Sequence, residues 1–258
     1  MSIENLSTSK LIYVRSNDRL PTAGATTTSF RVELGNAANI HRSVRIVLRS
    51  AHFANSQFNI RTGVNDTLYW THNAIDYSAV IGAGFYDTAA IIVAITAAMD
   101  AAMVGPAVTV TITQDPLTDL LSISWSAASG FIRTAAALVQ NIAFNIGFTS
   151  DRAAAQPYVS DSTPSLQGLT HCFLRSRELA PANQINSSEL IDNVLINIPV
   201  TAPYRGINHY EPADDELASI NYKTPTDITS VDIELRDEFD RVLDLRGQPT
   251  EFVFKVYF

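Results

Sequence analysis

The chain has 258 residues and a mass of 28.2 kDa; 46% of its residues are hydrophobic and 17% are charged. This length suffices for one large all-β domain or two smaller ones, and the low charge density fits either a surface partly covered by partners or a well-filled core. The formal net charge of -8 is uneven, because residues 1–61 carry eight Lys and Arg against three acids, whereas residues 62–258 carry ten against twenty-three. Such asymmetry favours association between neighbouring copies over a uniform nucleic-acid-binding surface, so nucleic acid is not predicted as a partner.

The cysteine content and the hydrophobic runs indicate in which cellular compartment the protein folds. The single cysteine, Cys172, lies in an apolar run, which excludes an intrachain disulfide and predicts a thiol that is hard to ionise. No signal-peptide pattern is visible at the N-terminus, and the longest apolar run, Thr88 to Met99, is too short to cross a bilayer. The sequence predicts a soluble protein, without a membrane span, that folds in a reducing compartment.

The first part of the chain shows the two-residue alternation of half-buried strands. Lys10 to Arg15 is a short strand candidate, and Phe30, Val32 and Leu34 alternate with charged residues. A third strand is predicted from Val44 to Phe53, with one slip in its apolar pattern that a β-bulge would produce.

The stretch from Asp66 to about Gln167 has a different pattern. Asp87 is a suitable N-cap for a helix that runs to about Val104 and is ended by a Gly-Pro pair, and a second helix is predicted for Thr134 to Ile142. Two hairpins are also predicted here, with strands at 67–70 and 77–81 and at 108–112 and 121–125.

Beyond this stretch the chain returns to short strands, predicted at 171–176, 194–200, 218–223, 231–236, 242–245 and 252–258. With the strands at Phe30 and Val44 they number eight, which is the count of a single jelly roll. The predicted class is therefore mainly β: an eight-stranded jelly roll with an inserted α+β region between its second and third strands. Residues 1–60 and 168–258 are expected to form the jelly roll, and 61–167 the insertion.

Residues that could carry chemistry are sparse. Gly82-Ala-Gly84 lies between a strand and a helix, but Asp87 would repel a pyrophosphate, so a capped turn is the better interpretation. The five histidines are scattered singly, and the acidic runs 214–216 and 237–240 lack the ligand spacing of a calcium loop. We therefore expect no metal, no cofactor and no catalytic residue set. Solvated turns are the preferred interpretation of the acidic runs.

Aromatic and basic residues gather in the proline-containing connection from Ala202 to Asp215. Tyr204, Arg205, His209 and Tyr210 are of the types that recur at interface hot spots, although packing against their own domain explains them equally well. The hypothesis is that this connection contacts a neighbouring subunit.

Several segments together resemble a known family of capsid proteins. These are Ser29-Phe-Arg-Val-Glu-Leu, the stretch from Val44 to Ile60, Gly84-Phe-Tyr before a helix, Ile233-Glu-Leu-Arg-Asp and Leu243-Asp-Leu-Arg-Gly. They resemble the single jelly-roll minor capsid (penton) proteins of virophages, polinton-like viruses and related large double-stranded DNA viruses. One departure is Glu238-Phe-Asp, where many relatives have a glycine.

The resemblance implies a structural virion protein that is not an enzyme. It implies pentamers at the fivefold vertices of an icosahedral capsid, contact with the major capsid protein, and synthesis in the host cytoplasm before incorporation into the virion capsid. Two alternatives stay open: a jelly-roll carbohydrate-binding or fibre-head module, which needs an aromatic platform or calcium cluster, and a cupin-like enzyme, which needs clustered ligands.

Overall fold

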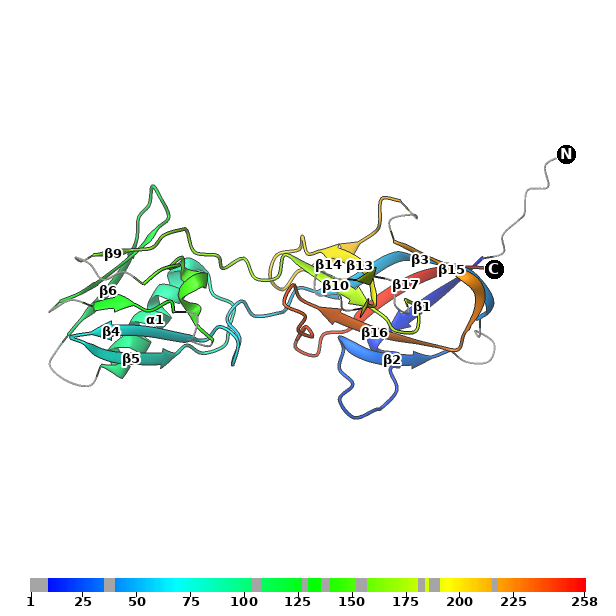
Figure 1. Cartoon of the computed structure of the whole chain (residues 1–258), viewed down its shortest axis with the longest axis horizontal. Helices are drawn as coiled ribbons and strands as arrows, with labels where there is room; N and C mark the ends of the chain where they lie inside the picture. The colour runs from blue at the N-terminus through cyan, green and yellow to red at the C-terminus, as the bar shows by residue number, and fades with distance from the viewer. Residues whose placement is uncertain are drawn as a thin grey trace. The chain divides into compact units, whose positions relative to one another are not determined.

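The structure is a computed structural model that describes residues 9–34, 40–103, 108–126, 130–135, 140–151, 157–180, 184–185, 191–214 and 218–258. The chain divides into two compact units (Figure 1). Met1–Gln57 and Leu169–Phe258 together make up the first, the jelly-roll unit, and Phe58–Gly168 makes up the second unit.

Two antiparallel sheets build the jelly-roll unit. Sheet A has the strand order β1-β17-β3-β14, with β15 also paired to β3, and sheet B has the order β13-β10-β16-β2. Most connections cross from one sheet to the other, which is the arrangement of a jelly roll, so the predicted fold class is confirmed. Sheet A comprises β1 (Ser9–Arg15), β3 (Ile40–Ala54), β14 (Ile207–Tyr210), β15 (Ser219–Ile228) and β17 (Thr250–Tyr257); sheet B comprises β2 (Ser29–Glu33), β10 (His171–Arg175), β13 (Val194–Pro199) and β16 (Ser230–Arg236).

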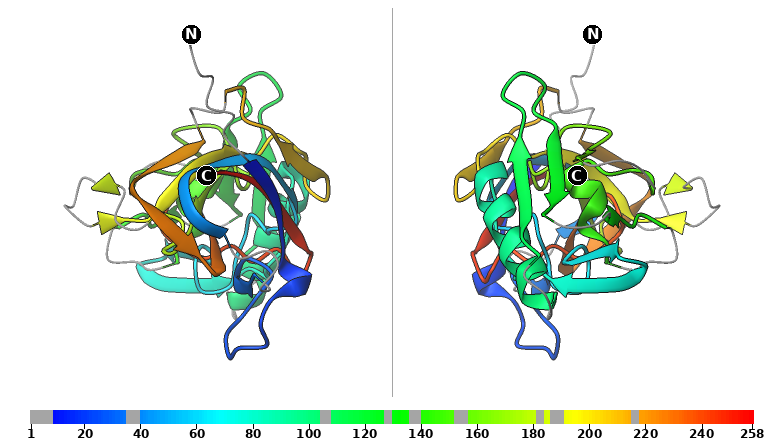
Figure 2. Two further views of the ribbon diagram at one scale, coloured as in Figure 1. Left: turned by 90° about the vertical axis from the view of Figure 1, so that its right-hand side faces the viewer. Right: turned by 90° about the vertical axis from the view of Figure 1, so that its left-hand side faces the viewer.

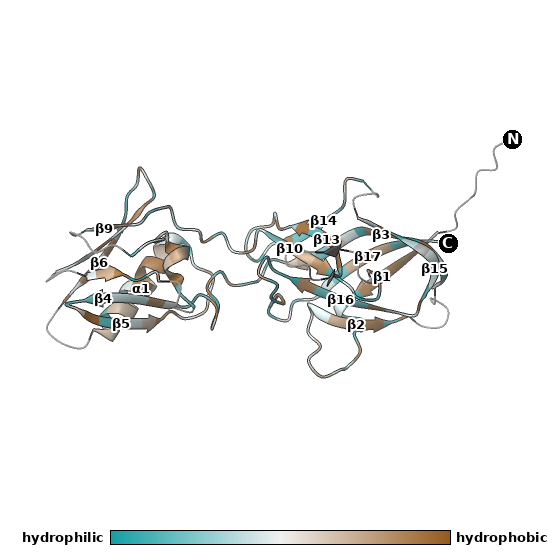
Figure 3. Cartoon of the chain, viewed as in Figure 1, coloured by the Kyte–Doolittle hydropathy of each residue, from teal (hydrophilic) through white to brown (hydrophobic). Residues whose placement is uncertain are grey.

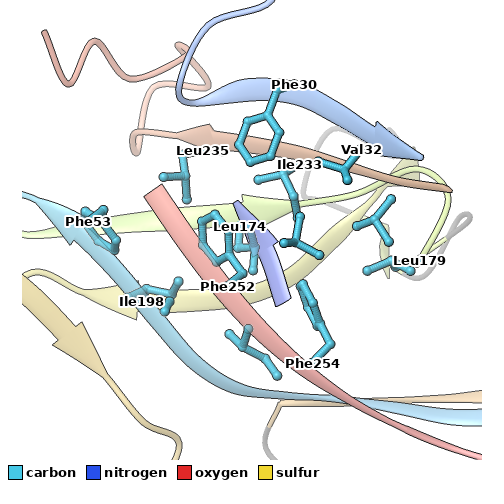
Figure 4. Packing of buried hydrophobic residues seen from close by; sticks show 14 of the residues in the cluster. Phe30, Val32, Phe53, Leu174, Leu179, Ile198, Ile233, Leu235, Phe252 and Phe254 are labelled. Atoms are coloured by element: carbon cyan, nitrogen blue, oxygen red, sulfur yellow. The ribbon is translucent and has the colours of Figure 1, made fainter. Parts of the chain in front are cut away.

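The core of this unit lies between the two sheets. Alternate residues of β16 and β17 are buried, as the sequence pattern predicted: Val231, Ile233 and Leu235 from sheet B, and Phe252, Phe254 and Val256 from sheet A. Their side chains meet those of Phe30, Phe53 and Leu174 between the layers (Figure 4), and the strands curl around this core when the unit is viewed from its end (Figure 2, left). Each such fully buried side chain contributes roughly 1.5–3 kcal/mol.

Strand membership of sheets A and B differs from the prediction in three places. The candidate at Lys10 is a strand and belongs to sheet A as β1, so β1, β2 and β3 all precede the second unit. Residues 242–245 form no strand; Val242 makes a single bridge to Arg236, and positive φ angles at Asp240 and Arg246 turn the chain on either side. The sequence did not predict β14, which pairs alongside β3.

The slip in the apolar pattern of β3 is a β-bulge, as predicted. Val253 pairs with Ser50 and Phe254 with Leu48, so the register of β3 against β17 shifts by one residue at this point. The described residues of the jelly-roll unit also form the 3-10 helix η1 (Ser16–Asp18) and the hairpin of β11 (Gln184–Ile185) and β12 (Ile191–Asp192).

The described residues of the second unit form two three-stranded sheets and one α-helix. The sheet orders are β5-β4-β8 and β6-β7-β9, and both predicted hairpins are present. Asn73 and Ala74 have φ angles of 51° and 59°, the left-handed pair that a two-residue type I′ turn between β4 and β5 requires. The strands are β4 (Thr67–His72), β5 (Ile75–Val80), β6 (Val110–Gln114), β7 (Leu121–Trp125), β8 (Gly130–Ile132) and β9 (Tyr158–Val159).

The helix α1 (Thr88–Ala102) begins where the sequence predicted. The Asp87 carboxylate accepts a hydrogen bond from the Ala90 N–H at 2.8 Å, which is an N-cap. Ile91, Ile95 and Met99 form its buried stripe, and α1 packs against β5 and β6 (Figure 2, right). Figure 3 shows apolar positions along α1 as well as along the strands of both units.

The second predicted helix covers residues 136–139, which lie outside the described residues. Of the described part of 134–142, only Ile142 is helical, at the start of the 3-10 helix η2 (Ile142–Ile146), which Asn141 caps. Within the described residues α1 is therefore the one α-helix.

Candidate subunit interface

The segment that the sequence analysis singled out as a connection, Ala202 to Asp215, contains the strand β14, so His209 and Tyr210 lie on that strand. Residues 200–206 link β13 to β14, and Asn208 holds this link in place. The side chain of Asn208 is buried and accepts hydrogen bonds from the N–H groups of Thr201 at 3.0 Å and Ala202 at 3.4 Å. Its Nδ2 donates to the carbonyl of Pro199 at 3.1 Å. One buried amide thus fixes the connection between the end of β13 and the start of β14.

A second amide residue ties the same connection to the end of β3. Asn55 Nδ2 donates to the Ala202 carbonyl at 2.8 Å, the Asn55 N–H donates to the Gly206 carbonyl at 2.8 Å, and the Arg205 N–H donates to the Asn55 carbonyl at 2.7 Å. Asn55 directly follows β3. The turn at 203–206 is therefore held against the chain where it leaves sheet A.

Arg205 is in a strained backbone conformation. The Gly206 N–H donates to the Pro203 carbonyl at 2.8 Å, which closes a four-residue turn whose third residue, Arg205, has a φ of +68°. This position of a type II turn favours glycine, and a residue with a Cβ is disfavoured there. The guanidinium lies 5.4 Å from the ring centroid of Tyr204, and the Arg205 side chain is exposed. This turn therefore places the guanidinium of Arg205 and the ring of Tyr204 next to each other at the surface.

The four predicted interface residues differ in exposure. Arg205 and His209 are exposed, whereas Tyr204 and Tyr210 are half-buried. Tyr210 packs against the core of the jelly-roll unit, and burial raises the pKa of its hydroxyl. Ile207, which the sequence analysis did not single out, has 74% of its surface exposed.

Two histidines that are 157 residues apart in sequence meet beside this connection. The pairing of β14 with β3 places His209 directly across from His52, with ring centroids 4.3 Å apart and the two Nδ1 atoms 3.3 Å apart. Glu211 lies 3.2 Å from Nε2 of His209, and His52 pairs on its other side with Glu251 of β17. The sequence treated these histidines as single residues, since only strand register brings them together.

A cavity of about 500 Å³ opens next to the histidine pair. Its lining comes from the ends of β1, β3, β14 and β17 and includes Arg15, His52, Ile207, Pro249 and Glu251. At the rim of the cavity, Arg15 of β1 donates from Nε to Oε2 of Glu251 on the neighbouring strand β17, at 2.6 Å. The cavity therefore combines the exposed aliphatic side chain of Ile207 with the charged side chains of Arg15 and Glu251. Such a cavity can bind an apolar side chain that has a polar neighbour.

A second cavity, of about 550 Å³, lies over sheet B and has a different character. Arg175 pairs with Asp240 at 2.6 Å, and Arg236 pairs with Glu234 at 2.8 Å and with Asp240 at 3.2 Å. The Asp232 carboxylate accepts from the hydroxyl of Ser176 and the N–H of Arg177. These charged side chains form ion pairs with one another at the surface, and each such pair contributes at most about 1 kcal/mol to the free energy of unfolding.

The remaining sequence candidates have local structural roles. Burial raises the pKa of the Cys172 thiol to about 12. The Asp237 carboxylate accepts from the N–H groups of Phe239 and Arg241, so it caps the acidic turn. In the run 214–216, residues 215 and 216 lie outside the described residues. No three or more His, Cys, Asp and Glu side chains in the described ranges are grouped so as to hold a metal ion. None of the helices formed by these residues is long and apolar enough to span a membrane.

Comparison with known proteins identifies the fold. No protein-family model and no curated protein matches the sequence. The structure is similar to the crystal structure of the selenomethionine-labelled mavirus penton protein, with a TM-score of 0.52 and 9% sequence identity over 97% of this chain and 100% of that chain. The resemblance stated from the sequence is thereby confirmed at the level of the fold: along nearly its whole length the chain is similar to a penton jelly-roll protein.

Proposed function

We propose that the chain is a structural capsid subunit, a minor capsid or penton protein that forms pentamers at the fivefold vertices and contacts the major capsid protein. The observation that carries this proposal is the likeness in fold to the mavirus penton protein over nearly all of both chains. The virion capsid is the proposed location, after synthesis in the host cytoplasm. We infer no enzymatic role.

The proposal divides the chain into a jelly roll formed by residues 1–60 and 168–258 and an insertion formed by 61–167. The compactness of Phe58–Gly168 as a unit of its own supports this division. In such a subunit the jelly roll would supply the contacts between copies.

The proposed contact between copies is the connection that carries Tyr204, Arg205, His209 and Tyr210. Its backbone is fixed by buried amides, so little conformational entropy would be lost when a neighbour binds. Arg and Tyr are enriched among interface hot spots, and here an exposed Arg stacks on a half-buried Tyr. Tyr210, which packs on the core, would mainly support the others.

The mass of the purified full chain in solution tests the function. A pentamer has a mass of about 141 kDa, five times the chain mass of 28.2 kDa. Light scattering coupled to size-exclusion chromatography distinguishes a pentamer from a monomer by this mass. A protein that stays at the chain mass at every concentration would contradict the proposal.

An Arg205→Gly variant tests the proposed contact separately from folding. Glycine adopts the φ of +68° without strain, so the variant should unfold at the same urea concentration as the wild type or a slightly higher one. Loss of the guanidinium should nevertheless lower the assembled fraction. If assembly is unchanged in Arg205→Gly and also in a Tyr204→Ala, Tyr210→Ala double variant, the connection is not the contact.

A further inference from the structure

The two histidines that meet across β3 and β14 have the separation of two ligands of one metal ion. The Nδ1 atoms of His52 and His209 lie 3.3 Å apart. Two nitrogens that each bind one Zn²⁺ at about 2.1 Å lie about 3.4 Å apart in tetrahedral geometry and about 3.0 Å apart at a right angle. The sequence predicted no metal because its histidines are scattered singly, whereas strand register brings these two together.

Glu211 orients one of the two rings. Its Oε1 atom lies 3.2 Å from Nε2 of His209. A neutral imidazole that donates from Nε2 to a carboxylate keeps the lone pair of Nδ1 available. The same arrangement recurs around protein-bound zinc, because the carboxylate fixes the ring and raises its basicity. The Nδ1 atom of His209 is therefore an acceptor that faces His52.

The backbone on both sides of the pair is rigid. Phe53, next to His52, pairs across the strands with Asn208, next to His209, and each of these two neighbours has only 1% of its surface exposed. The two imidazole rings are already in edge contact, with centroids 4.3 Å apart. An ion would therefore order few additional rotamers when it binds.

Solvent reaches the pair and can complete the coordination. The side chain of His209 is 52% exposed, and the cavity of about 500 Å³ that His52 lines has room for water. In the part of the chain that the structure describes, no third His, Cys, Asp or Glu joins the two to form a metal-binding group. The neighbouring Glu251 is paired with Arg15 at 2.6 Å. Two protein ligands plus water correspond to an open site and not to a closed structural zinc site.

We propose that His52 and His209 bind one transition-metal ion of the Zn²⁺, Ni²⁺ and Cu²⁺ class through their Nδ1 atoms. Neutral imidazole nitrogen suits these ions, whereas Mg²⁺ and Ca²⁺ prefer oxygen ligands. Without metal, the proton between the two Nδ1 atoms belongs to His52, because His209 is the acceptor. When the ion binds, this proton leaves Nδ1 of His52 and solvent supplies one to Nε2, so both imidazoles stay neutral. The ion then links β14 to β3.

Isothermal titration calorimetry of the full chain without a histidine tag tests the site. The protein is freed of metal with a chelator and titrated with ZnCl₂ near neutral pH, and one Zn²⁺ per chain is expected. Glu211→Gln, which removes only the carboxylate that orients His209, should weaken binding about 10-fold. His52→Gln and His209→Gln each remove a ligand and should weaken binding more than Glu211→Gln does.

His171→Gln is the matched control. His171 lies on β10 of sheet B, its side chain is 36% exposed, and it also has a glutamate, Glu238, 3.9 Å away. It has no second histidine opposite it, since its partner across β10 and β13 is Pro199. Zn²⁺ binding by this variant should equal that of the wild type. Urea midpoints measured without metal should show that all the variants are folded.

Electron paramagnetic resonance of the Cu²⁺-loaded protein identifies the ligands directly. Coupling of the copper to two imidazole nitrogens is expected in the wild type, and to at most one in His52→Gln and in His209→Gln. Absence of Zn²⁺ binding even at millimolar concentration would overturn the inference, as would binding that neither ligand substitution weakens. Both results leave the capsid proposal in place, because the site does not depend on the pentamer.

Discussion

Removal of the Asn208 side chain should destabilise the jelly-roll unit and loosen the connection that carries Arg205. The amide is buried and makes hydrogen bonds to the N–H groups of Thr201 and Ala202 and to the carbonyl of Pro199. Asn208→Ala leaves these backbone groups without their partner. At roughly 1 kcal/mol per hydrogen bond, and because water reaches only part of the site, the free energy of unfolding should fall by about 2–3 kcal/mol.

Urea unfolding followed by far-UV circular dichroism measures this loss. Wild type and variant are compared at one protein concentration, because association stabilises the folded state by mass action. Asn221→Ala is the matched control, since Asn221 lies exposed on β15, and it should change the free energy by less than about 0.5 kcal/mol. If Asn208→Ala loses no more stability than Asn221→Ala, the buried amide does not hold the connection.

Three further predictions concern both units. Because burial raises the pKa of Cys172 to about 12, its thiol stays protonated at pH 8 and should react with a thiol reagent only after unfolding; rapid labelling of native protein would contradict this. Asp87→Ala removes the N-cap of α1 and should lower the stability of the second unit by about 0.5–2 kcal/mol in urea unfolding followed by tryptophan fluorescence, whereas Asp87→Asn should retain most of it. Gly147→Ala should prevent stable folding of the second unit, because an added Cβ would lie 2.0 Å from the Ser162 carbonyl oxygen at a φ of +89°. Gly24→Ala, at a φ of +83° with open space around it, should lower the free energy of unfolding by only about 1–2 kcal/mol. Equal losses of stability in the two variants would show that the close contact with Ser162 does not determine the effect at Gly147.

The main architecture could be predicted because most of its strands alternate between apolar and polar residues. In β16 and β17 every second residue is a large apolar one, and these residues are the ones buried between the sheets. The N-cap of α1 was equally visible, since Asp87 precedes a long run without turn residues.

Among the strands that the sequence did not predict, β14 shows most clearly why a strand can be missed. In β14 the inward position between Ile207 and His209 is Asn208, so a polar residue occupies the place where the pattern requires an apolar one. Residues 242–245 show the opposite case: Leu243 and Leu245 are buried, but the segment lies between two turns and pairs only through Val242. Apolar alternation reports burial and not hydrogen bonding between strands.

The candidate interface could be predicted only in part. The aromatic and basic composition of the connection was visible, whereas its exposed Ile207 and the adjoining cavity depend on how four strand ends come together. The contact between His52 and His209 depends on the register of β14 against β3, which no local pattern encodes.

Cryo-electron microscopy of the purified full chain tests the central claim most directly. The account predicts ring-shaped particles with fivefold symmetry in which each subunit contributes a jelly roll. Single 28.2 kDa particles at all concentrations, or rings of another symmetry, would contradict the assignment as a vertex pentamer.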